Sequence, residues 1–365
     1  MRDFSAIACC SRWSRVTALA MMGAIFSAGL DVNMQILMSE QAHERVRDRL
    51  AAFGERVDVV CIGVTAVGEL TFSRNGQPIP ASEVDPEIYW VSLDLWPAGR
   101  LPHFFRQMMK GTKGQWAQVF SAGLDNPIFG SMMSRGLRLT KSRAQAIAIV
   151  EYVVAHAVSL LHPIAEQAAA QAAHDWRRVT FREINATHWV IVGFGAIGEE
   201  IAKRARAFGV KITVVRRSVA PDPLADDVLP MEGLNGALGD ADVVVLACAL
   251  NDETRNMADQ AFFASLKPGA ILINIGRGDL VDEDALRAGL DRNQPAHAVL
   301  DVFHTEPLPQ DAWFWDHPKV RVTAHASNAG DGVLARGDAQ FLENLARFLE
   351  GRPLLAEARP EEAGV

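Results

Sequence analysis

Cysteine is scarce in this sequence, which has four cysteines among 365 residues: Cys9, Cys10, Cys61 and Cys248. None forms a Cys-x-x-Cys pair or another metal-ligand spacing, so the sequence predicts no metal site. Two of the four lie in apolar runs that are typical of strands rather than of a disulfide framework. We therefore expect reduced thiols and a reducing, cytoplasmic location.

An excess of positive charge is also missing. The 36 Lys and Arg residues are outnumbered by 44 Asp and Glu residues, and the formal net charge is −8. Because phosphate backbones bind clustered Lys and Arg, this balance argues against nucleic acid as the main partner. The hydrophobic content of 49% is that of an ordinary soluble protein. At this length one hydrophobic core is insufficient, so we expect two domains.

A long apolar run near the N-terminus, 16–30, is shorter than the roughly 20 residues that a membrane-spanning helix needs, so we expect no membrane partner. Three arginines precede the run and small residues end it, which resembles a secretory or targeting signal. We favour instead a misplaced start or a disordered extension over 1–33, because Met34 directly opens a strand-like run. A structured extension is the third possibility.

Short strands and helices follow from Met34. The pattern predicts a first strand from Met34, a helix over 40–53, and strands over 57–64, 88–95 and 116–120. The later run 143–161 predicts a long helix that is apolar on nearly every side and ends or kinks at Pro163. Such a helix is buried at a domain or subunit junction, which suggests a homodimer. A junction within a monomer would give the same pattern.

From Thr187 onward, strands and helices alternate strictly. The predicted strands are 189–192, 211–215, 242–247, 270–274, 298–301 and 320–323. This alternation indicates a parallel, doubly wound sheet. A final amphipathic helix over 333–350 follows the sheet, and we expect it to cross back onto the first domain.

A glycine fingerprint marks the first strand-to-helix turn of this second region. Its residues are Gly193, Phe194, Gly195, Ala196, Ile197 and Gly198. It follows an apolar strand and opens a helix, which is the context that dinucleotide binding requires and a ligand-free glycine turn does not. The glycines permit a tight turn, close approach to a pyrophosphate and close helix–strand packing, and the helix N-terminus binds phosphates.

The residues that end the next strand discriminate between the two nicotinamide cofactors. An NAD(H) site usually has Asp or Glu there, whereas this chain has Arg216, Arg217 and Ser218. Two guanidinium groups and a hydroxyl suit the 2'-phosphate of NADP(H), which a carboxylate would repel. We therefore expect NADP(H) to be preferred over NAD(H). The alternative is that both arginines are solvated surface charges.

Three polar residues follow later strands of the predicted sheet, where open α/β folds bind ligands. His325 can give a proton to an alkoxide near neutral pH. Glu306 would favour the charged ring and fix its orientation. Arg277 presents a planar fork that can hold a carboxylate and polarise a carbonyl. His325 alone could be structural and Arg277 alone a surface ion pair, but together the three predict hydride transfer to a 2-oxo acid.

These motifs resemble those of the D-isomer-specific 2-hydroxyacid dehydrogenases over essentially the whole of 34–351. Beside the fingerprint, the similar segments are Ile273-Asn274-Ile275-Gly276-Arg277-Gly278, Val281-Asp282-Glu283, Ala285-Leu286, Leu300-Asp301-Val302-Phe303 and Glu306-Pro307. The resemblance implies an oxidoreductase that interconverts a small 2-oxo acid and a D-2-hydroxy acid. It assigns general acid/base catalysis to His325, support of that ring to Glu306 and substrate anchoring to Arg277.

The same resemblance implies further contacts with cofactor and substrate. Asp301 would hold the nicotinamide amide, and N–H groups of Ala122, Gly123 and Leu124 would cradle the substrate carboxylate. The other cofactor positions it implies are Cys248, Ala249, Thr254, Ile275, Gly276, His325 and Ser327. The arginine run is most similar to the NADPH-using, glyoxylate- and hydroxypyruvate-reductase-like branch. The family usually forms homodimers.

Three positions depart from the family pattern. Ala324 replaces a proline before the histidine, Ser327 replaces a glycine two residues after it, and Ala249 replaces a proline after the third strand. None of these changes removes a proton donor or acceptor. Two other functions stay open: a nicotinamide-binding regulatory or scaffold protein with this fold, and a dehydrogenase for a different small acid or inorganic anion.

The sequence thus predicts a two-domain α/β protein, in which a Rossmann-type doubly wound parallel sheet is joined to a smaller flavodoxin-like α/β substrate domain. We expect the substrate domain over 34–138, completed by the helix 330–351, the dinucleotide-binding domain over 139–329 and a tail over 352–365. The substrate pocket depends on loops around 66–76, 92–106 and 123–133. Five large side chains are either pocket residues or core and interface residues: Trp90, Trp96, Met108, Trp313 and Trp315.

Overall fold

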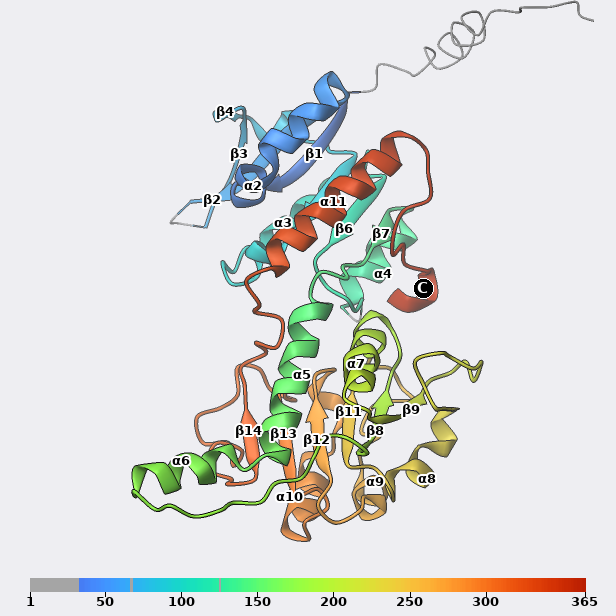
Figure 1. Cartoon of the computed structure of the whole chain (residues 1–365). Coiled ribbons are helices and arrows are strands. Elements are labelled where there is room, and N and C mark those ends of the chain that lie inside the picture. Colours follow the sequence, from blue (N-terminus) through green and yellow to red (C-terminus); the bar gives the residue numbers. More distant parts are fainter. Residues whose placement is uncertain (1–32, 66–67, 125) are drawn as a thin grey trace, which may run out of the picture.

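The computed structural model describes residues 33–65, 68–124 and 126–365. Cys9, Cys10 and nearly all of the expected extension lie outside the described residues, as do two positions of the loop around 66–76. Figure 1 shows two parts, each built on a sheet, with α5 (Ala146–Leu161) running between them. The fold class is the predicted one, and we call the two parts the first and the second domain.

The first domain is built on one mixed sheet. Its strands are β1 (Met34–Ser39), β2 (Val57–Val64), β3 (Leu70–Arg74), β4 (Gln77–Ile79), β5 (Ile88–Val91), β6 (Trp116–Val119) and β7 (Arg138–Thr140). They lie in the order β4-β3-β2-β1-β5-β6-β7. Pairing is parallel from β2 through β1, β5 and β6 to β7, whereas β3 and β4 extend one edge as an antiparallel hairpin.

The helices α2 (Glu40–Leu50), α3 (Leu101–Lys110) and α4 (Pro127–Ser134) flank this first sheet, together with the C-terminal helix described below. The helix α2 begins where the Ser39 side chain accepts a hydrogen bond from the backbone N–H of Ala42. Two sequence predictions need correction here. The expected helix 40–53 ends as an α-helix at Leu50 and continues as a 3-10 helix, and the expected strand 88–95 ends at Val91.

The second domain is built on a sheet that is parallel throughout, as predicted. Its strands are β8 (His188–Val192), β9 (Lys211–Val215), β10 (Asp227–Leu229), β11 (Val243–Leu246), β12 (Ile271–Asn274), β13 (His297–Leu300) and β14 (Val320–Val322). They lie in the order β10-β9-β8-β11-β12-β13-β14. The order reverses direction at β8, which is the point where such sheets bind ligands. The helices are α5, α7 (Ala196–Ala207), α8 (Leu234–Leu238), α9 (Gln260–Ser265) and α10 (Glu283–Asp291).

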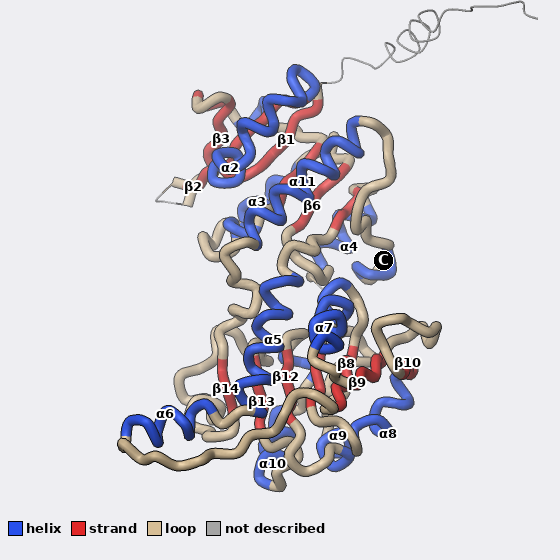
Figure 2. The backbone as a smooth tube through the Cα atoms, viewed as in Figure 1, coloured by secondary structure: helices blue, strands red, loops and turns tan. Residues whose placement is uncertain are grey.

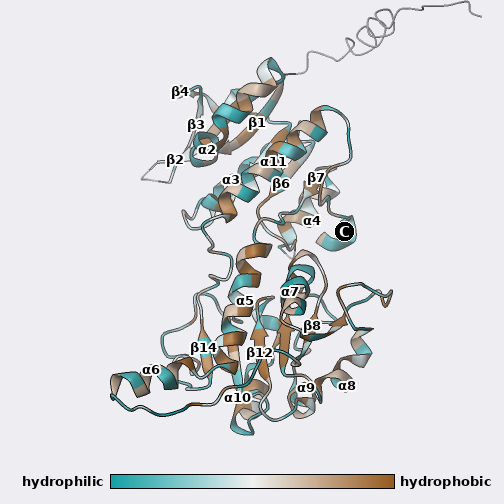
Figure 3. Ribbon diagram, in the orientation of Figure 1, coloured by the Kyte–Doolittle hydropathy of each residue, from teal (hydrophilic) through white to brown (hydrophobic). Residues whose placement is uncertain are grey.

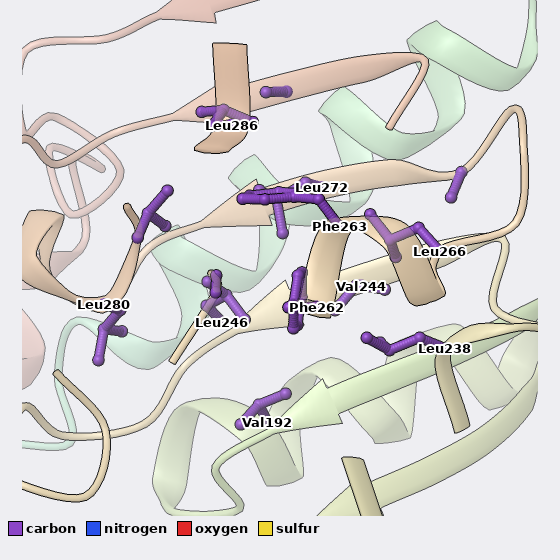
Figure 4. Packing of buried hydrophobic residues seen from close by; sticks show 14 of the residues in the cluster. Val192, Leu238, Val244, Leu246, Phe262, Phe263, Leu266, Leu272, Leu280 and Leu286 are labelled. Carbon is purple, nitrogen blue, oxygen red and sulfur yellow. The ribbon is translucent and has the colours of Figure 1, made fainter. Parts of the chain in front are cut away.

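Both faces of this second sheet are buried, which explains its continuous apolar runs. In β11, Val244 and Leu246 join one hydrophobic cluster and Val243 and Val245 join another on the opposite face. Figure 4 shows part of the first cluster, where Phe262 of α9 lies between Val244 and Leu246 and Phe263 lies beside Leu272. In Figure 3 the central strands are correspondingly brown, while the outer helices carry teal faces.

The C-terminal helix α11 (Val333–Leu349) packs on the first domain beside α2, as Figure 1 shows. Its Phe341 ring stacks on Trp90 and Trp116, with centroids 5.2 and 5.7 Å away. The tail after α11 also returns to the first domain, because Ala358 N–H donates to Leu139 O at 2.8 Å. The expected tail 352–365 therefore lies against the first sheet.

The helix α5 begins at Ala146, three residues later than expected, and α6 (Ile164–Ala172) follows a break at Pro163. Figure 2 shows α6 and the long loop behind it standing away from the second domain as an arm, which we define as 162–187. Within the described residues, no single helix has the length and apolarity to cross a membrane, although the bent pair α5 and α6 together would meet that criterion.

Candidate active site

Three strand ends of the second sheet bring the expected catalytic residues together. The strands β12, β13 and β14 are neighbours, and Arg277, Asp301 and His325 follow them within three residues of their last positions. Because parallel strands end at the same edge of a sheet, these residues meet where open α/β folds bind ligands. The geometry of that edge is set by hydrogen bonds from the three connecting turns.

His325 and Glu306 form the central pair. The ring nitrogen Nδ1 lies 2.8 Å from Glu306 Oε2, and both side chains are about one-third exposed, at 28% and 34%. Burial raises the pKa of Glu306, but hydrogen bonds from His325 and the Phe303 N–H, with the charges of His325 and Arg277, outweigh it and lower that pKa. The carboxylate therefore stays ionised, and Nε2 is the ring nitrogen that can exchange a proton with a substrate.

The loop that carries His325 is held by Asp301. The Asp301 side chain is fully buried and accepts hydrogen bonds from the Thr323 hydroxyl at 2.6 Å and from the N–H groups of Ala326 and Ser327. The His325 N–H donates to the Asp301 carbonyl, and His325 itself has φ +51°. A non-glycine residue rarely adopts this left-handed backbone, so the surrounding bonds impose it.

Arg277 is placed by a braced turn after β12. The Asn274 side chain donates to Arg277 O at 2.9 Å and accepts from the Gly276 N–H at 3.1 Å. A Cβ atom at Gly278 would lie 2.0 Å from the carbonyl carbon of Phe303, so only glycine lets this turn approach the loop that leads to Glu306. The turn and the loop thus fix Arg277 and Glu306 relative to each other.

The glycine turn fits a dinucleotide. Gly193 has φ +95°, and a Cβ there would lie 2.6 Å from Cys248 Cα. A Cβ at Gly195 would instead meet no atom within 4 Å, so the turn faces open space at that point. Gly195 is also the N-cap of α7 and provides no capping side chain, which leaves the first N–H groups of the helix for a phosphate.

The two expected phosphate-binding arginines differ in their surroundings. Arg216 is engaged by the loop itself, since it donates to Ser218 O and Ala220 O and pairs with Asp222 at 3.2 Å. Its guanidinium also lies 5.3 Å from the Phe194 ring centroid, beside the glycine turn. Arg217 and Ser218 are exposed, as a group that meets a ligand phosphate must be.

The other expected cofactor residues lie at the ends of β11 and β12. Cys248 packs beside Gly193, and Thr254 closes the next turn by donating to Ala249 O at 2.8 Å. Ile275 and Gly276 are buried directly after β12. Burial raises the pKa of the Cys248 thiol to about 12, so this group stays neutral. Among the described residues, both cysteines are free and no cluster of His, Cys, Asp or Glu forms a metal site.

The five large side chains that were candidates for the substrate pocket divide between the core, the surface and the site. Trp90 and Met108 are buried in the first domain, so their core interpretation is confirmed. Trp313 is partly buried against the second core, and Trp315 donates to Pro309 O at its surface. Trp96 alone of these five has a ring contact with His325, at a centroid distance of 5.0 Å. The expected cradle, 122–124, follows Phe120, on which Trp96 stacks.

Several supporting residues were not found from the sequence. Asn274 braces the Arg277 turn, Thr323 binds the Asp301 carboxylate, and the Tyr152 hydroxyl of α5 lies 2.8 Å from Thr323. Asn274 lies within the segment 273–278 that resembles a family motif, so that motif could have identified it as a supporting residue. Thr323 and Tyr152 are 171 positions apart, and no local pattern links them.

Comparison with known proteins is consistent with this geometry. The family model described as "D-isomer specific 2-hydroxyacid dehydrogenase, NAD binding domain" matches residues 154–327. The chain is 31% identical over 243 residues to D-3-phosphoglycerate dehydrogenase of Bacillus subtilis (strain 168), covering 64% of this chain and 45% of that protein. It is 35% identical over 178 residues to glyoxylate/hydroxypyruvate reductase A of Serratia proteamaculans (strain 568), covering 48% and 56%.

The chain spans about half the length of these two relatives. A solved structure covers it more fully: a D-isomer specific 2-hydroxyacid dehydrogenase family protein from Aeromonas salmonicida subsp. salmonicida A449, with a TM-score of 0.73 and 27% identity. The alignment covers 90% of this chain and 99% of that one. Residues 154–327 thus match the NAD binding domain of the D-isomer specific 2-hydroxyacid dehydrogenase family, and the fold of the whole chain is similar to that of a solved protein of this family.

Proposed function

We propose that this protein is an NADPH-dependent reductase that converts a small 2-oxo acid into a D-2-hydroxy acid. The observation that carries the proposal is the 2.8 Å pair of His325 and Glu306 at the strand ends that also present Arg277. The similarity of half the chain to a protein named glyoxylate/hydroxypyruvate reductase A supports glyoxylate and hydroxypyruvate as substrates.

Proton transfer is the step that His325 performs. Reduction of a ketone leaves an alkoxide, and the imidazolium delivers a proton to that oxygen from Nε2. Glu306 binds Nδ1, so it keeps the ring oriented and stabilises its charged form. In the reverse direction the neutral ring accepts the proton from the hydroxyl group. His325 is thus the acid in one direction and the base in the other.

Substrate binding is the role of Arg277 and of the cradle at 122–124. The guanidinium fork suits a carboxylate, and its positive charge polarises the adjacent carbonyl as negative charge develops there. Backbone N–H groups of the cradle complete the binding of the carboxylate. Closure of the two domains over the substrate excludes water from the developing alkoxide.

Cofactor binding is assigned to the glycine turn and to the loop after β9. Bound NADPH supplies the hydride. The open side of Gly195 and the N-terminus of α7 accommodate the pyrophosphate. Exposed Arg217 and Ser218 meet the 2'-phosphate, while Arg216 shapes the loop that presents them. Asp301, whose buried carboxylate is engaged by Thr323, Ala326 and Ser327, would act by holding the His325 loop beside the nicotinamide.

The test is oxidation of NADPH and of NADH by protein that begins at Met34, with glyoxylate, hydroxypyruvate, pyruvate and phenylpyruvate as oxidants. We expect turnover of a 2-oxo acid, with kcat/KM for NADPH at least about tenfold above that for NADH, the gain of one charge-assisted contact. Folded protein that binds NADPH and reduces none of the four acids would contradict the proposal. That outcome would favour a nicotinamide-binding regulatory or scaffold protein.

We also propose a homodimer, assembled through α5 and the arm. Trp176 is fully exposed on the arm, and a hollow of about 460 Å³ beside it is lined by Ala170, His174 and Trp176, among others. A large apolar side chain held in water is typical of an interface. Light scattering should give a dimer for the wild type and a monomer for Trp176→Asp. Phe208→Asp, at an exposed residue outside the arm, is the control. A monomeric wild type would contradict this assembly.

A further inference from the structure

Trp96 contacts both halves of the candidate active site. It follows the 3-10 helix η3 (Leu93–Leu95) of the first domain, yet its ring meets His325 of the second domain at 5.0 Å and 80°. On the other side it stacks on Phe120, with centroids 6.2 Å apart and planes 21° apart. Phe120 directly precedes the segment that holds the expected carboxylate cradle. Trp96 therefore bridges the cradle and the proton donor.

Asp94 fixes the short helix that carries Trp96. Its side chain is 8% exposed and accepts hydrogen bonds from the Ser39 hydroxyl at 2.5 Å and the Ser92 hydroxyl at 2.6 Å. It also pairs with Arg45 of α2 at 2.9 Å. This network explains why the chain leaves the strand at Val91, because Asp94 turns inward instead of continuing the sheet.

The same arginine ties this segment to the C-terminal helix. Arg45 Nε lies 2.7 Å from Asp338 of α11, and the Asp338 side chain is 1% exposed. Buried charges are stable only when they are paired, so moving η3 would leave the buried Asp94 without Arg45 and would leave Arg45 with Asp338 alone. The segment that carries Trp96 is thus held by α2, β1 and α11 together.

The exposure of Trp96 is unusual for a residue held so firmly. The residue is 38% exposed, although the nearby carboxylates Asp94 and Asp338 are only 8% and 1% exposed. The hydrogen bonds and the ion pair of Asp94 stabilise the fold and do not require a large apolar side chain at position 96. The indole ring instead contacts the imidazole ring of His325.

We infer that Trp96 is a positioning residue for His325 and the aromatic wall of the substrate site. This inference rests on the proposed function. The indole limits rotation of the imidazole, whose other constraint is Glu306 on Nδ1. It also covers the ring from water, and a misplacement of about 1 Å at a reacting group can lower turnover by about 10²-fold.

The aromatic wall at Trp96 and Phe120 also limits which substituent the substrate can carry on its third carbon. A 2-oxo acid bound between the cradle and His325 places the group on its third carbon near Trp96 and Phe120. Aromatic faces form no strong hydrogen bonds with a phosphate dianion, so a phosphate ester would lose hydration without replacement. The class of substrate is therefore an unphosphorylated 2-oxo acid, with hydrogen or an uncharged group at that position.

Kinetics of Trp96→Ala and Trp96→Phe test the inference, with Phe208→Ala as a control for loss of an exposed aromatic residue. We expect Trp96→Ala to lower kcat for glyoxylate by about 10- to 100-fold with a smaller change in KM, and Trp96→Phe to recover most of that loss. Wild-type kcat/KM for hydroxypyruvate should exceed that for its phosphate ester by about 100-fold, a difference of about 2.7 kcal/mol. A Trp96→Ala variant within twofold of wild type, or a preferred phosphate ester, would overturn the inference.

A fluorescence measurement tests the contact without turnover, which separates its failure from failure of the proposed function. Protonated imidazole in contact with indole quenches its emission, so the measurement is made in mildly acidic buffer. His325→Ala should therefore increase tryptophan emission in the wild type, and the same substitution should cause no increase in Trp96→Phe protein. Equal increases in both backgrounds would show that Trp96 does not contact His325, whatever the enzyme reduces.

Discussion

Two histidine–carboxylate pairs of equal length lie near the end of the second sheet. His325 is 2.8 Å from Glu306, and His304 is 2.8 Å from Asp279. Asp279 also pairs with Arg255 at 3.0 Å, and the His304 side chain is 42% exposed. The second pair is thus part of a solvated surface network, in which the carboxylate divides its charge between two partners.

The surroundings of the first pair are different. Glu306 accepts the Phe303 N–H in addition to His325, and the imidazole meets Trp96 on another side. The backbone of His325 is held in the left-handed region by the Asp301 loop. A short nitrogen–oxygen distance therefore does not identify a catalytic histidine. What distinguishes His325, the proposed acid/base, is a fixed backbone, one engaged nitrogen and a ring contact with Trp96.

Alanine substitution of each histidine should have very different effects on turnover. We expect His325→Ala to lower kcat by about 10³-fold while NADPH binding is retained, because the proton donor is lost and the glycine turn is not touched. His304→Ala should stay within about twofold of wild type, the range of a surface change. The measurements are steady-state turnover and NADPH titration by fluorescence. Equal losses of kcat in the two variants would show that the two histidines do not differ in function.

Neutralising the carboxylate of each pair should also affect turnover unequally. Glu306→Gln keeps the size of the side chain but removes the charge that favours imidazolium, so kcat should fall by about 10²-fold. Asp279→Asn changes only a pair that solvent already screens, and turnover should remain close to wild type. The comparison of kcat in the two variants is the test. A Glu306→Gln enzyme with full activity would mean that Glu306 does not support the ring.

The same contrast between engaged and exposed groups separates the two arginines of the cofactor loop. Arg217→Ala should raise KM for NADPH by about tenfold and leave KM for NADH nearly unchanged, because one charge-assisted contact is worth that much. Arg216→Ala should act mainly on thermal stability, since its bonds go to Ser218 O, Ala220 O and Asp222. In a variant that carries both Arg216→Ala and Arg217→Ala, equal increases in KM for NADPH and for NADH would contradict the NADPH preference.

The smallest expected effect is the acid dependence of stability. The pKa of Glu306 is lowered from 4.5, so its contribution to stability is complete above that value and is lost as the pH falls through the lower, folded-state pKa. The difference in Tm between wild type and Glu306→Gln should be about 2 °C near neutral pH, because the pair is partly solvated, and should shrink in acid. A difference that grows in acid would reverse the assigned sign.

Residues whose role depends on the local order of strands, turns and helices were predictable from the sequence. Gly193 and Gly198 were found because a strand, a glycine turn and a helix follow one another, and the structure shows why a side chain is excluded at each. Arg277 and His325 were placed by the strands that precede them. The β3–β4 hairpin was missed, although Asn75 and Gly76 have positive φ and form the dipeptide that favours such a turn.

Residues that act through distant partners were not predictable. The position of Trp96 depends on Arg45, which is 49 residues from Asp94 and 293 residues from Asp338. Local periodicity carries no information about such a network, so Trp96 could be named only as one of several aromatic candidates. The short strands β7 and β10 were also missed.

Proton transfer by His325 is tested by the pH dependence of kcat/KM for reduction and for oxidation. If His325 is the acid in reduction and the base in oxidation, kcat/KM for reduction falls with rising pH and kcat/KM for oxidation rises through the same ionisation. Both dependences should disappear in His325→Ala. Profiles that slope in the same direction, or that survive in His325→Ala, would show that another group transfers the proton.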